Sequence, residues 1–237
     1  MICKLIPKIN FETIRNTSTR FYEVRHGENL MATMWVKDLH VFGFGNKPDR
    51  YGELWYNNNA YHIDPNVRYG SEWPFYDQHS NKVMSFISAD DEIMIEKKKM
   101  FSKKTVLKKR YIYHEKVSIN NRIFKVYTVN LGVNGQHYVI KEGEKTVSII
   151  HIHDKQEFYS HEMDLYMEDD NTVILLTFLY CFVVNMYQYY HTDETLIHGD
   201  GFGADIWSKS KPYILEKFDP EFIERIKKQE EKNINEK

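Results

Sequence analysis

The sequence predicts a mainly β fold of the α+β class, in which a closed antiparallel β-barrel surrounds one hydrophobic helix near the C-terminal end. Three observations lead to this prediction. Short apolar runs separated by turn residues fill residues 20–168, and a single long apolar run occupies residues 171–190. In addition, no helical pattern separates the predicted strands, which argues against parallel βαβ units because each of them needs a crossover helix.

The composition is that of a folded protein with a large core. The chain has 237 residues, of which 42% are hydrophobic and 15% aromatic. Aromatic and β-branched residues favour strands. The formal net charge is −2, so no overall field attracts the chain to nucleic acid or to an anionic membrane. Cys3 and Cys181 lie far apart, which argues against a disulfide framework and favours a reducing compartment.

Six runs rich in Val, Ile, Tyr and Phe mark the predicted strands most clearly, at residues 20–25, 52–56, 82–88, 110–115, 122–129 and 145–153. Turn residues stand between such runs, at Asn120–Asn121, Asn134–Gly135 and Glu142–Gly143. Asn and Gly adopt positive φ at low cost, so these positions suit hairpin turns. The strands are therefore expected to pair as an antiparallel meander, which closes readily on itself.

One apolar run stands out by its length: NTVILLTFLYCFVVNMYQYY, residues 171–190. As a helix it would be about 28 Å long, so the stretch 172–190 is also a candidate membrane span. The acidic cluster at 168–170 suits the positive end of a helix dipole, and Asn171 is the predicted N-cap. The run is either an enclosed core helix or a membrane anchor.

Polar residues and flanking charges favour the enclosed helix. A polar stripe recurs at helical spacing and would face a protein neighbour rather than lipid; it consists of Thr177, Cys181, Asn185 and Gln188. Acidic residues flank the run on both sides, whereas the Lys and Arg clusters that orient membrane anchors are missing there. A closed barrel would bury every face of such a helix. A membrane-anchored protein that spans at 172–190 remains the alternative.

The order of these elements resembles the tubby C-terminal-like superfamily, in particular its LURP-one-related and bacterial YxjI-like branch. The resemblance covers roughly residues 60–190, and it is carried by PFYDQHSNKVMSFI (74–87), KMFS (99–102), RYIYHE (110–115) and HYVIKEGEKTVSIIHIHDKQEFYSHEMDLYMEDDNTVILLTFLYCFVVNMY (137–187). It implies a barrel of about 12 strands around a central hydrophobic helix. The Cys-rich and Pro-rich features of the related phospholipid scramblases are missing, so scramblase activity is not expected.

The predicted organisation has three parts: an N-terminal extension or the first strands at 1–50, the tubby-like barrel with its central helix at 51–190, and a C-terminal extension at 191–237. The extension contains a short helix with Asp219 as N-cap and Pro220 at its first position, followed by a charged tail. Its apolar face is formed by Phe222, Ile223 and Ile226, which are expected to dock the helix on the barrel.

The segment KKKMFSKKTVLKKR, residues 97–110, is the candidate binding site. It contains eight positive residues: Lys97, Lys98, Lys99, Lys103, Lys104, Lys108, Lys109 and Arg110. Each such charge contributes about 1 kcal/mol near an anionic membrane, so phosphoinositide or another anionic lipid is the expected ligand. The competing interpretation is a solvated loop whose lysines prevent edge aggregation. Nucleic acid is disfavoured, because Lys dominates the segment and no recognised reading motif is present.

His151, His153 and Glu157 follow the HxHxxxE spacing of cupin metal sites, in which two histidines on one strand face and a carboxylate converge on a metal. The glycines that flank the cupin motif are absent, and no second histidine motif follows. Partly exposed strand histidines are the plainer interpretation. A metal-dependent, cupin-like enzyme is therefore an alternative function.

Taken together, these features favour a non-enzymatic binding protein. The sequence holds no nucleophile elbow and no phosphate-binding loop, so neither catalytic residues nor a cofactor are predicted. The expected partner is an anionic lipid bound through residues 97–110, with a protein partner as the other candidate. The first residues lack the apolar segment of a signal peptide, so the expected location is cytoplasmic, peripheral to a membrane where lipid is bound.

Overall fold

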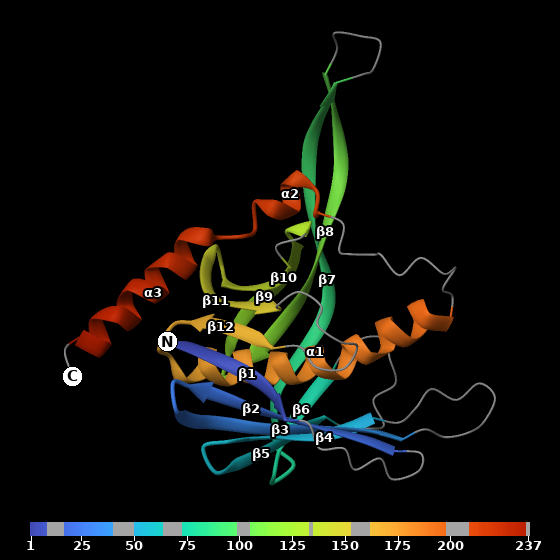
Figure 1. Ribbon diagram of the computed structural model, residues 1–237. Helices are drawn as coiled ribbons and strands as arrows, with labels where there is room; N and C mark the ends of the chain where they lie inside the picture. Colours follow the sequence, from blue (N-terminus) through green and yellow to red (C-terminus); the bar gives the residue numbers. More distant parts are fainter. Residues whose placement is uncertain are drawn as a thin grey trace.

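The computed structural model is a closed antiparallel barrel with one long helix inside it (Figure 1). It describes residues 1–8, 17–39, 50–63, 73–98, 105–132, 135–152, 162–197 and 209–235. Within these residues consecutive strands are neighbours throughout, and β1 closes the barrel by pairing with β12. The predicted fold class, a closed antiparallel barrel around a hydrophobic C-terminal helix, is confirmed.

The barrel has 12 strands in the described part of the chain. They are β1 (Ile2–Lys8), β2 (Thr17–His26), β3 (Asn29–Leu39), β4 (Arg50–Tyr56), β5 (Asn59–Ile63), β6 (Trp73–Asp77), β7 (Lys82–Lys98), β8 (Thr105–Ile119), β9 (Arg122–Asn130), β10 (Gln136–Glu142), β11 (Lys145–Ile152) and β12 (Met163–Met167). The first strands thus belong to the barrel wall, since β2 and β3 pair along their length.

Short turns gather at one end of the barrel, here called the turn end. They join β2 to β3, β4 to β5, β6 to β7, β8 to β9 and β10 to β11. Asn120 and Asn121 have φ of 49° and 59° there, and Gly143 has φ of 58°, in agreement with the turn prediction. At the opposite end, here called the far end, most of the residues that join the strands lie outside the described part.

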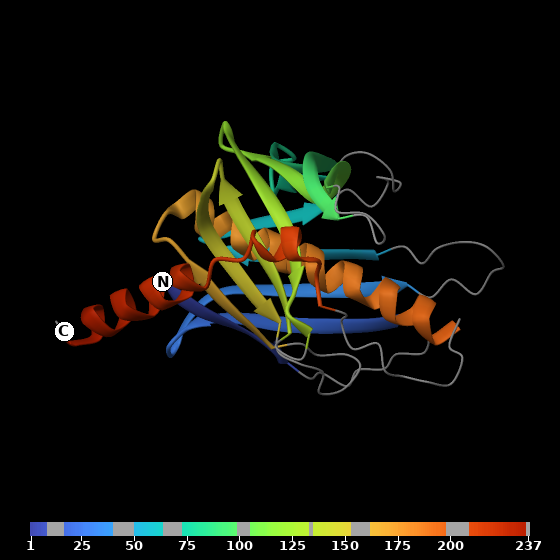
Figure 2. The same ribbon diagram turned by 90° about the horizontal axis from the view of Figure 1, so that it is seen from above.

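The predicted apolar helix is α1 (Asn171–Ile197), which begins at the turn end and runs through the barrel (Figures 1 and 2). Phe178 and Phe182 are both fully buried. The Phe178 ring meets Tyr56 edge-on with 5.2 Å between centroids, and Phe182 meets Phe75 at 6.0 Å. The helix is therefore the centre of the core. No helix in the described ranges has the length and apolar character needed to span a membrane.

The polar stripe of α1 is buried inside the barrel, as its spacing predicted. Thr177 Oγ1 lies 2.9 Å from Ser148 Oγ on β11 and 2.7 Å from the Val173 carbonyl. Asn185 Nδ2 donates to the Cys181 carbonyl at 2.8 Å, while the side chain of Gln188 lies outside the described part. These bonds satisfy polar groups that burial would otherwise leave without partners.

Helix α1 starts with a different cap from the predicted one. Asp170, and not Asn171, is the N-cap, because the Val173 amide donates to Asp170 Oδ1 at 2.9 Å. Aspartate caps as well as asparagine and adds a negative charge at the positive end of the helix dipole. The predicted cap was therefore wrong by one residue, although the acidic cluster that indicated the helix start supplies the actual cap.

The C-terminal segment packs on the outside of the barrel as α2 (Pro212–Leu215) and α3 (Pro220–Asn235). Phe222 and Ile226 are each 1% exposed, and the Phe222 amide donates to Asp219 Oδ1 at 3.0 Å, so the predicted docking face and N-cap are confirmed. These side chains complete an outer apolar cluster whose wall residues are Ile112, Tyr127, Val129, Val139, Ile149 and Tyr166.

Candidate functional site

The β7/β8 hairpin is far longer than the barrel wall requires (Figure 1). The two strands pair regularly along their length, but their outer neighbours stop early. β6 pairs with β7 only as far as Phe86, and β9 pairs with β8 only as far as Glu115. Residues 87–98 and 105–114 therefore leave the barrel as a two-stranded ribbon, which we call the arm.

The arm contains most of the predicted lipid site and corrects its expected conformation. The loop interpretation of residues 97–110 is wrong for both of its ends, because 97–98 complete β7 and 105–110 begin β8. Of the eight predicted binding residues, those in described strands are Lys97, Lys98, Lys108, Lys109 and Arg110. The other three, Lys99, Lys103 and Lys104, lie outside the described residues.

One face of the arm continues the lumen side of the barrel wall, because Met84 and Phe86 point into the core and side chains alternate along a strand. On this lumen-side face the large apolar side chains are exposed: Met94 is 55% exposed, Leu107 64%, Tyr111 55% and Tyr113 54%. Neighbouring exposed apolar groups are typical of an interaction surface. None of these four apolar residues is among the eight predicted binding residues.

The opposite face of the arm is anchored at its base. Ile112 is buried in the outer apolar cluster, and His114 is buried with its ring 5.3 Å from that of Tyr127. Asp91 accepts hydrogen bonds from Lys125 Nζ at 2.5 Å and from the Tyr127 hydroxyl at 2.6 Å. Burial raises the pKa of the Asp91 carboxyl, but these two bonds together with the nearby His114 and the charge of Lys125 lower the pKa overall. The base of the arm is thus fixed to β9.

Charge changes sign along the arm. The base carries Asp90, Asp91 and Glu92, whereas residues 97–110 carry the eight positive charges. Glu92 forms an ion pair with Lys109 at 2.5 Å, and Lys109 Nζ also lies 5.4 Å from the centroid of the Tyr111 ring. The distal half of the arm therefore combines cations with exposed apolar side chains, while the base is acidic.

The alternative metal site is not assembled within the described residues. His153 and Glu157 lie outside them, and the described part holds no group of three His, Cys, Asp or Glu side chains suited to a metal. His151 stacks on His137 with 4.3 Å between ring centroids, and Phe218 packs edge-on against His137 at 4.8 Å. Burial lowers the pKa of His137 to about 3, so this ring is neutral at physiological pH. The stacked pair forms part of the packing beneath the C-terminal segment.

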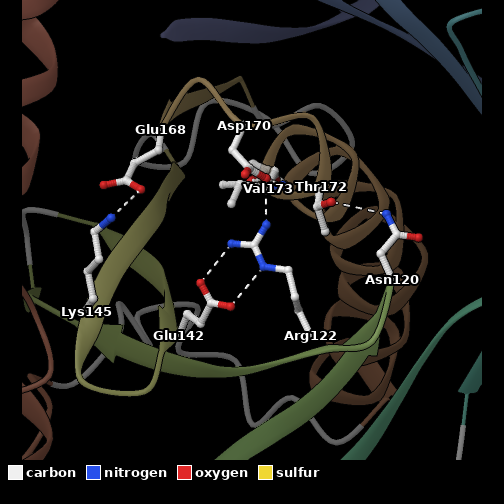
Figure 3. A network of polar contacts seen from close by, with 9 residues as sticks. Asn120, Arg122, Glu142, Lys145, Glu168, Asp170, Thr172 and Val173 are labelled. Carbon is white, nitrogen blue, oxygen red and sulfur yellow. Dashed lines mark hydrogen bonds and ion pairs between the residues drawn. The ribbon is translucent and has the colours of Figure 1, made fainter.

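A polar network at the turn end fixes the start of α1 (Figure 3). Arg122 on β9 binds Glu142 on β10 through two hydrogen bonds, of 2.9 and 2.8 Å, and donates to Asp170 at 2.8 Å. The Val173 amide and then Arg122 lower the pKa of Asp170. Nearby, Asn120 donates to Thr172 at 3.1 Å. Because these groups bind one another across β9, β10 and the start of α1, the network anchors the helix in the barrel.

A partly buried carboxyl, that of Glu115, lies where the arm leaves the barrel. The Tyr180 hydroxyl on α1 donates to Glu115 Oε2 at 2.7 Å, and Tyr138 packs edge-on against Tyr180 at 5.3 Å. Burial raises the pKa of Glu115, and the hydrogen bond from Tyr180 opposes this effect. The contact ties the central helix to the strand that carries the arm.

Comparison of the chain with protein-family models, with curated proteins and with solved structures finds no match in any of the three. A proposal about function therefore rests on the structure, in which the arm is the most prominent surface feature. The sequence signal for its β7 strand is the apolar run Ile93–Met94–Ile95 within SADDEIMIEKK (88–98), in which two β-branched residues share one strand face.

Proposed function

We propose that the protein is a non-enzymatic barrel that binds anionic lipid, phosphoinositide included, through the distal half of its arm. The observation that carries this proposal is that one projecting ribbon combines exposed Met94 and Leu107 with a cluster of cations. The arm would dock on the surface of a bilayer without crossing it. The resemblance of residues 60–190 to the tubby C-terminal-like superfamily also supports a lipid-facing role.

Electrostatic attraction supplies the first part of the binding energy. Residues 93–110 contain the eight cations of the basic segment and one anion, Glu96, so their formal charge is +7. Each cation near an anionic bilayer contributes about 1 kcal/mol, and the contribution falls off within a Debye length. The acidic base of the arm keeps the rest of the molecule away from the same surface. Binding should therefore be steep in lipid charge and sensitive to salt.

Apolar contacts supply the second part. Met94 and Leu107 lie on the lumen-side face in the distal half, and each leaves more than half of its side chain exposed to water. Transfer of apolar surface into the acyl boundary gains about 25 cal/mol per Å². Tyr111 follows on the same face, and tyrosine rings favour the headgroup level. Cations and apolar groups are thus arranged along the arm in the order that an interfacial site needs.

The test is co-sedimentation with vesicles of phosphatidylcholine alone or with added phosphatidylserine or phosphoinositide. We expect the native chain to bind only the anionic vesicles and to be released at high salt. The variant Lys108→Glu/Lys109→Glu should bind at least about tenfold more weakly, because two favourable charges become repulsive. Binding to neutral vesicles of equal strength would contradict the proposal.

A matched control is available on α3. Lys227→Glu/Lys228→Glu makes the same charge change on exposed lysines, and Lys227 likewise forms one surface ion pair, with Glu224 at 3.2 Å. Because α3 lies on the barrel exterior away from the arm (Figure 1), this variant should bind vesicles like the native chain. If both variants lose binding equally, overall charge and not the arm controls the interaction.

A further inference from the structure

The β7 edge of the arm carries backbone groups that no strand among the described residues pairs. β8 lies on one side of residues 87–98, and β6 on the other side reaches only Phe86. An unpaired strand edge of this length is a template for another strand. Proline, glycine and bulges commonly interrupt such edges, but residues 87–98 contain neither Pro nor Gly and pair regularly with β8.

We propose that a second copy of this chain pairs with this edge, so that two arms join antiparallel through their β7 strands. Charge complementarity favours this partner, because the acidic base of one arm then lies beside the basic distal half of the other. With Met94 on the two-fold axis, the register places the exposed Asp90 opposite Lys98, and symmetry repeats this pair; Asp91 comes opposite Lys97 but is already bound by Lys125 and Tyr127. Opposite charges directly across two strands stabilise the pairing.

A register centred on Met94 pairs the charges of the two β7 strands more favourably than registers centred on Ile93 or Ile95. The two-fold axis is perpendicular to the joint sheet, so the same face of both arms must lie on the same side. Because side chains alternate along a strand, this requires an axis that passes a residue paired with its own copy, and not a point between two residues. Centring on Ile93 places Asp90 opposite Glu96, which repels. Centring on Ile95 leaves Glu92 opposite Lys98 as the opposite-charge pair within β7. In the Met94 register Glu92 lies opposite Glu96, but Lys109 already neutralises Glu92.

The β8 edge does not suit the same symmetric pairing. Its basic residues are consecutive, so a register centred on Lys109 places Lys109 opposite itself and Lys108 opposite Arg110. Like charges directly opposite destabilise a strand pair. Self-association is therefore assigned to β7.

The dimer would form one four-stranded ribbon. Because the axis is perpendicular to the sheet, the lumen-side faces of both arms lie on the same side of this ribbon. The pairing rests on the arm alone and does not depend on the proposed lipid binding. It engages Lys97 and Lys98, so a second copy and an anionic bilayer compete for the distal half of the arm.

Site-specific cross-linking in the full chain, without lipid, tests the register. Met94→Cys places a thiol on the axis opposite its own copy, whereas the native Cys3 and Cys181 are buried. A short bis-maleimide should join Met94→Cys chains into covalent dimers. The control Leu107→Cys, on the exposed lumen-side face of β8, should stay largely monomeric. Equal cross-linking of the two variants would overturn the proposed pairing.

Charge-swapped variants supply an independent measurement by analytical ultracentrifugation. We expect the native chain to be dimeric at about 100 μM, a concentration at which micromolar pairing is nearly complete. Asp90→Lys and Lys98→Asp should each weaken self-association about tenfold, because symmetric attractive pairs become repulsive. An equimolar mixture restores opposite charges across the axis and should recover dimers. A monomeric native chain, or a mixture no better than its components, would overturn the inference.

Discussion

At the residue scale, Glu115 shows how enclosure of α1 affects a single side chain. Its carboxyl lies between the barrel wall and the helix and accepts a hydrogen bond from Tyr180 at 2.7 Å. Burial raises the pKa of Glu115 in the folded protein above its unfolded value. The protonated form is therefore favoured by folding. The stability that the protonated Glu115 supplies is complete below the pKa of Glu115 in the unfolded chain, and it is lost as the pH rises through the pKa of Glu115 in the folded protein.

Glu115→Gln should therefore change stability in a pH-dependent way. The amide keeps an acceptor for Tyr180 but does not ionise, so the variant avoids the cost of a buried charge. We expect its free energy of unfolding, relative to the native chain, to be higher at pH 8 than at pH 4. Urea unfolding at the two pH values measures this, with the exposed Glu144→Gln as control. A relative stability that falls between pH 4 and pH 8 would contradict a raised pKa of Glu115 in the folded protein.

At the element scale, the seating of α1 depends on its capped start and its contacts with the wall. Asp170 accepts from the Val173 amide at 2.9 Å and from Arg122 at 2.8 Å, so it joins the helix to β9. These bonds lower the pKa of Asp170. The stability that they supply is present above the unfolded pKa and is lost as the pH falls through the lowered folded pKa.

Asp170→Asn removes the negative charge of this side chain but keeps an oxygen that can cap the helix. Asparagine still caps a helix, so the main loss is the ion pair with the partly exposed Arg122. We expect a loss of about 1 kcal/mol at pH 7, since the pair is charged and hydrogen-bonded but screened by solvent. The difference from the native chain should shrink as the pH falls through the lowered folded pKa of Asp170. Asp169→Asn, at an exposed neighbouring site, is the control for thermal and urea unfolding.

Elements were predictable from the sequence where one physical signal dominated. The apolar run at 171–190 and the Asn turn at 120–121 each had a clear signal, and both lie where expected. The arm was missed because its charges resemble a loop, whereas regular cross-strand pairing extends both strands through them. Asn171 was preferred to Asp170 as a cap because both residue types cap well, and sequence does not distinguish neighbouring candidates.

At the scale of the whole molecule, the turn end of the barrel and the arm differ in kind. Short turns and the Arg122 network close the turn end, where α1 begins (Figure 3). The arm projects from the barrel wall across the direction of α1, as a ribbon anchored at its base through Asp91 (Figure 1). Stability is thus concentrated in the barrel and its helix, and the proposed binding surface projects away from them. Changes to the distal half of the arm should therefore alter binding without unfolding the core.

The most direct test of this account is to shorten the arm and measure vesicle binding. Ile93 and Arg110 are directly paired, so residues 94–109 can be replaced by Asn-Gly, which forms a two-residue hairpin turn. We predict that the shortened protein melts close to the native temperature, because the core and the outer apolar cluster are unchanged, and that it no longer binds anionic vesicles. A folded, shortened protein that still binds those vesicles as tightly as the native chain would contradict the central claim.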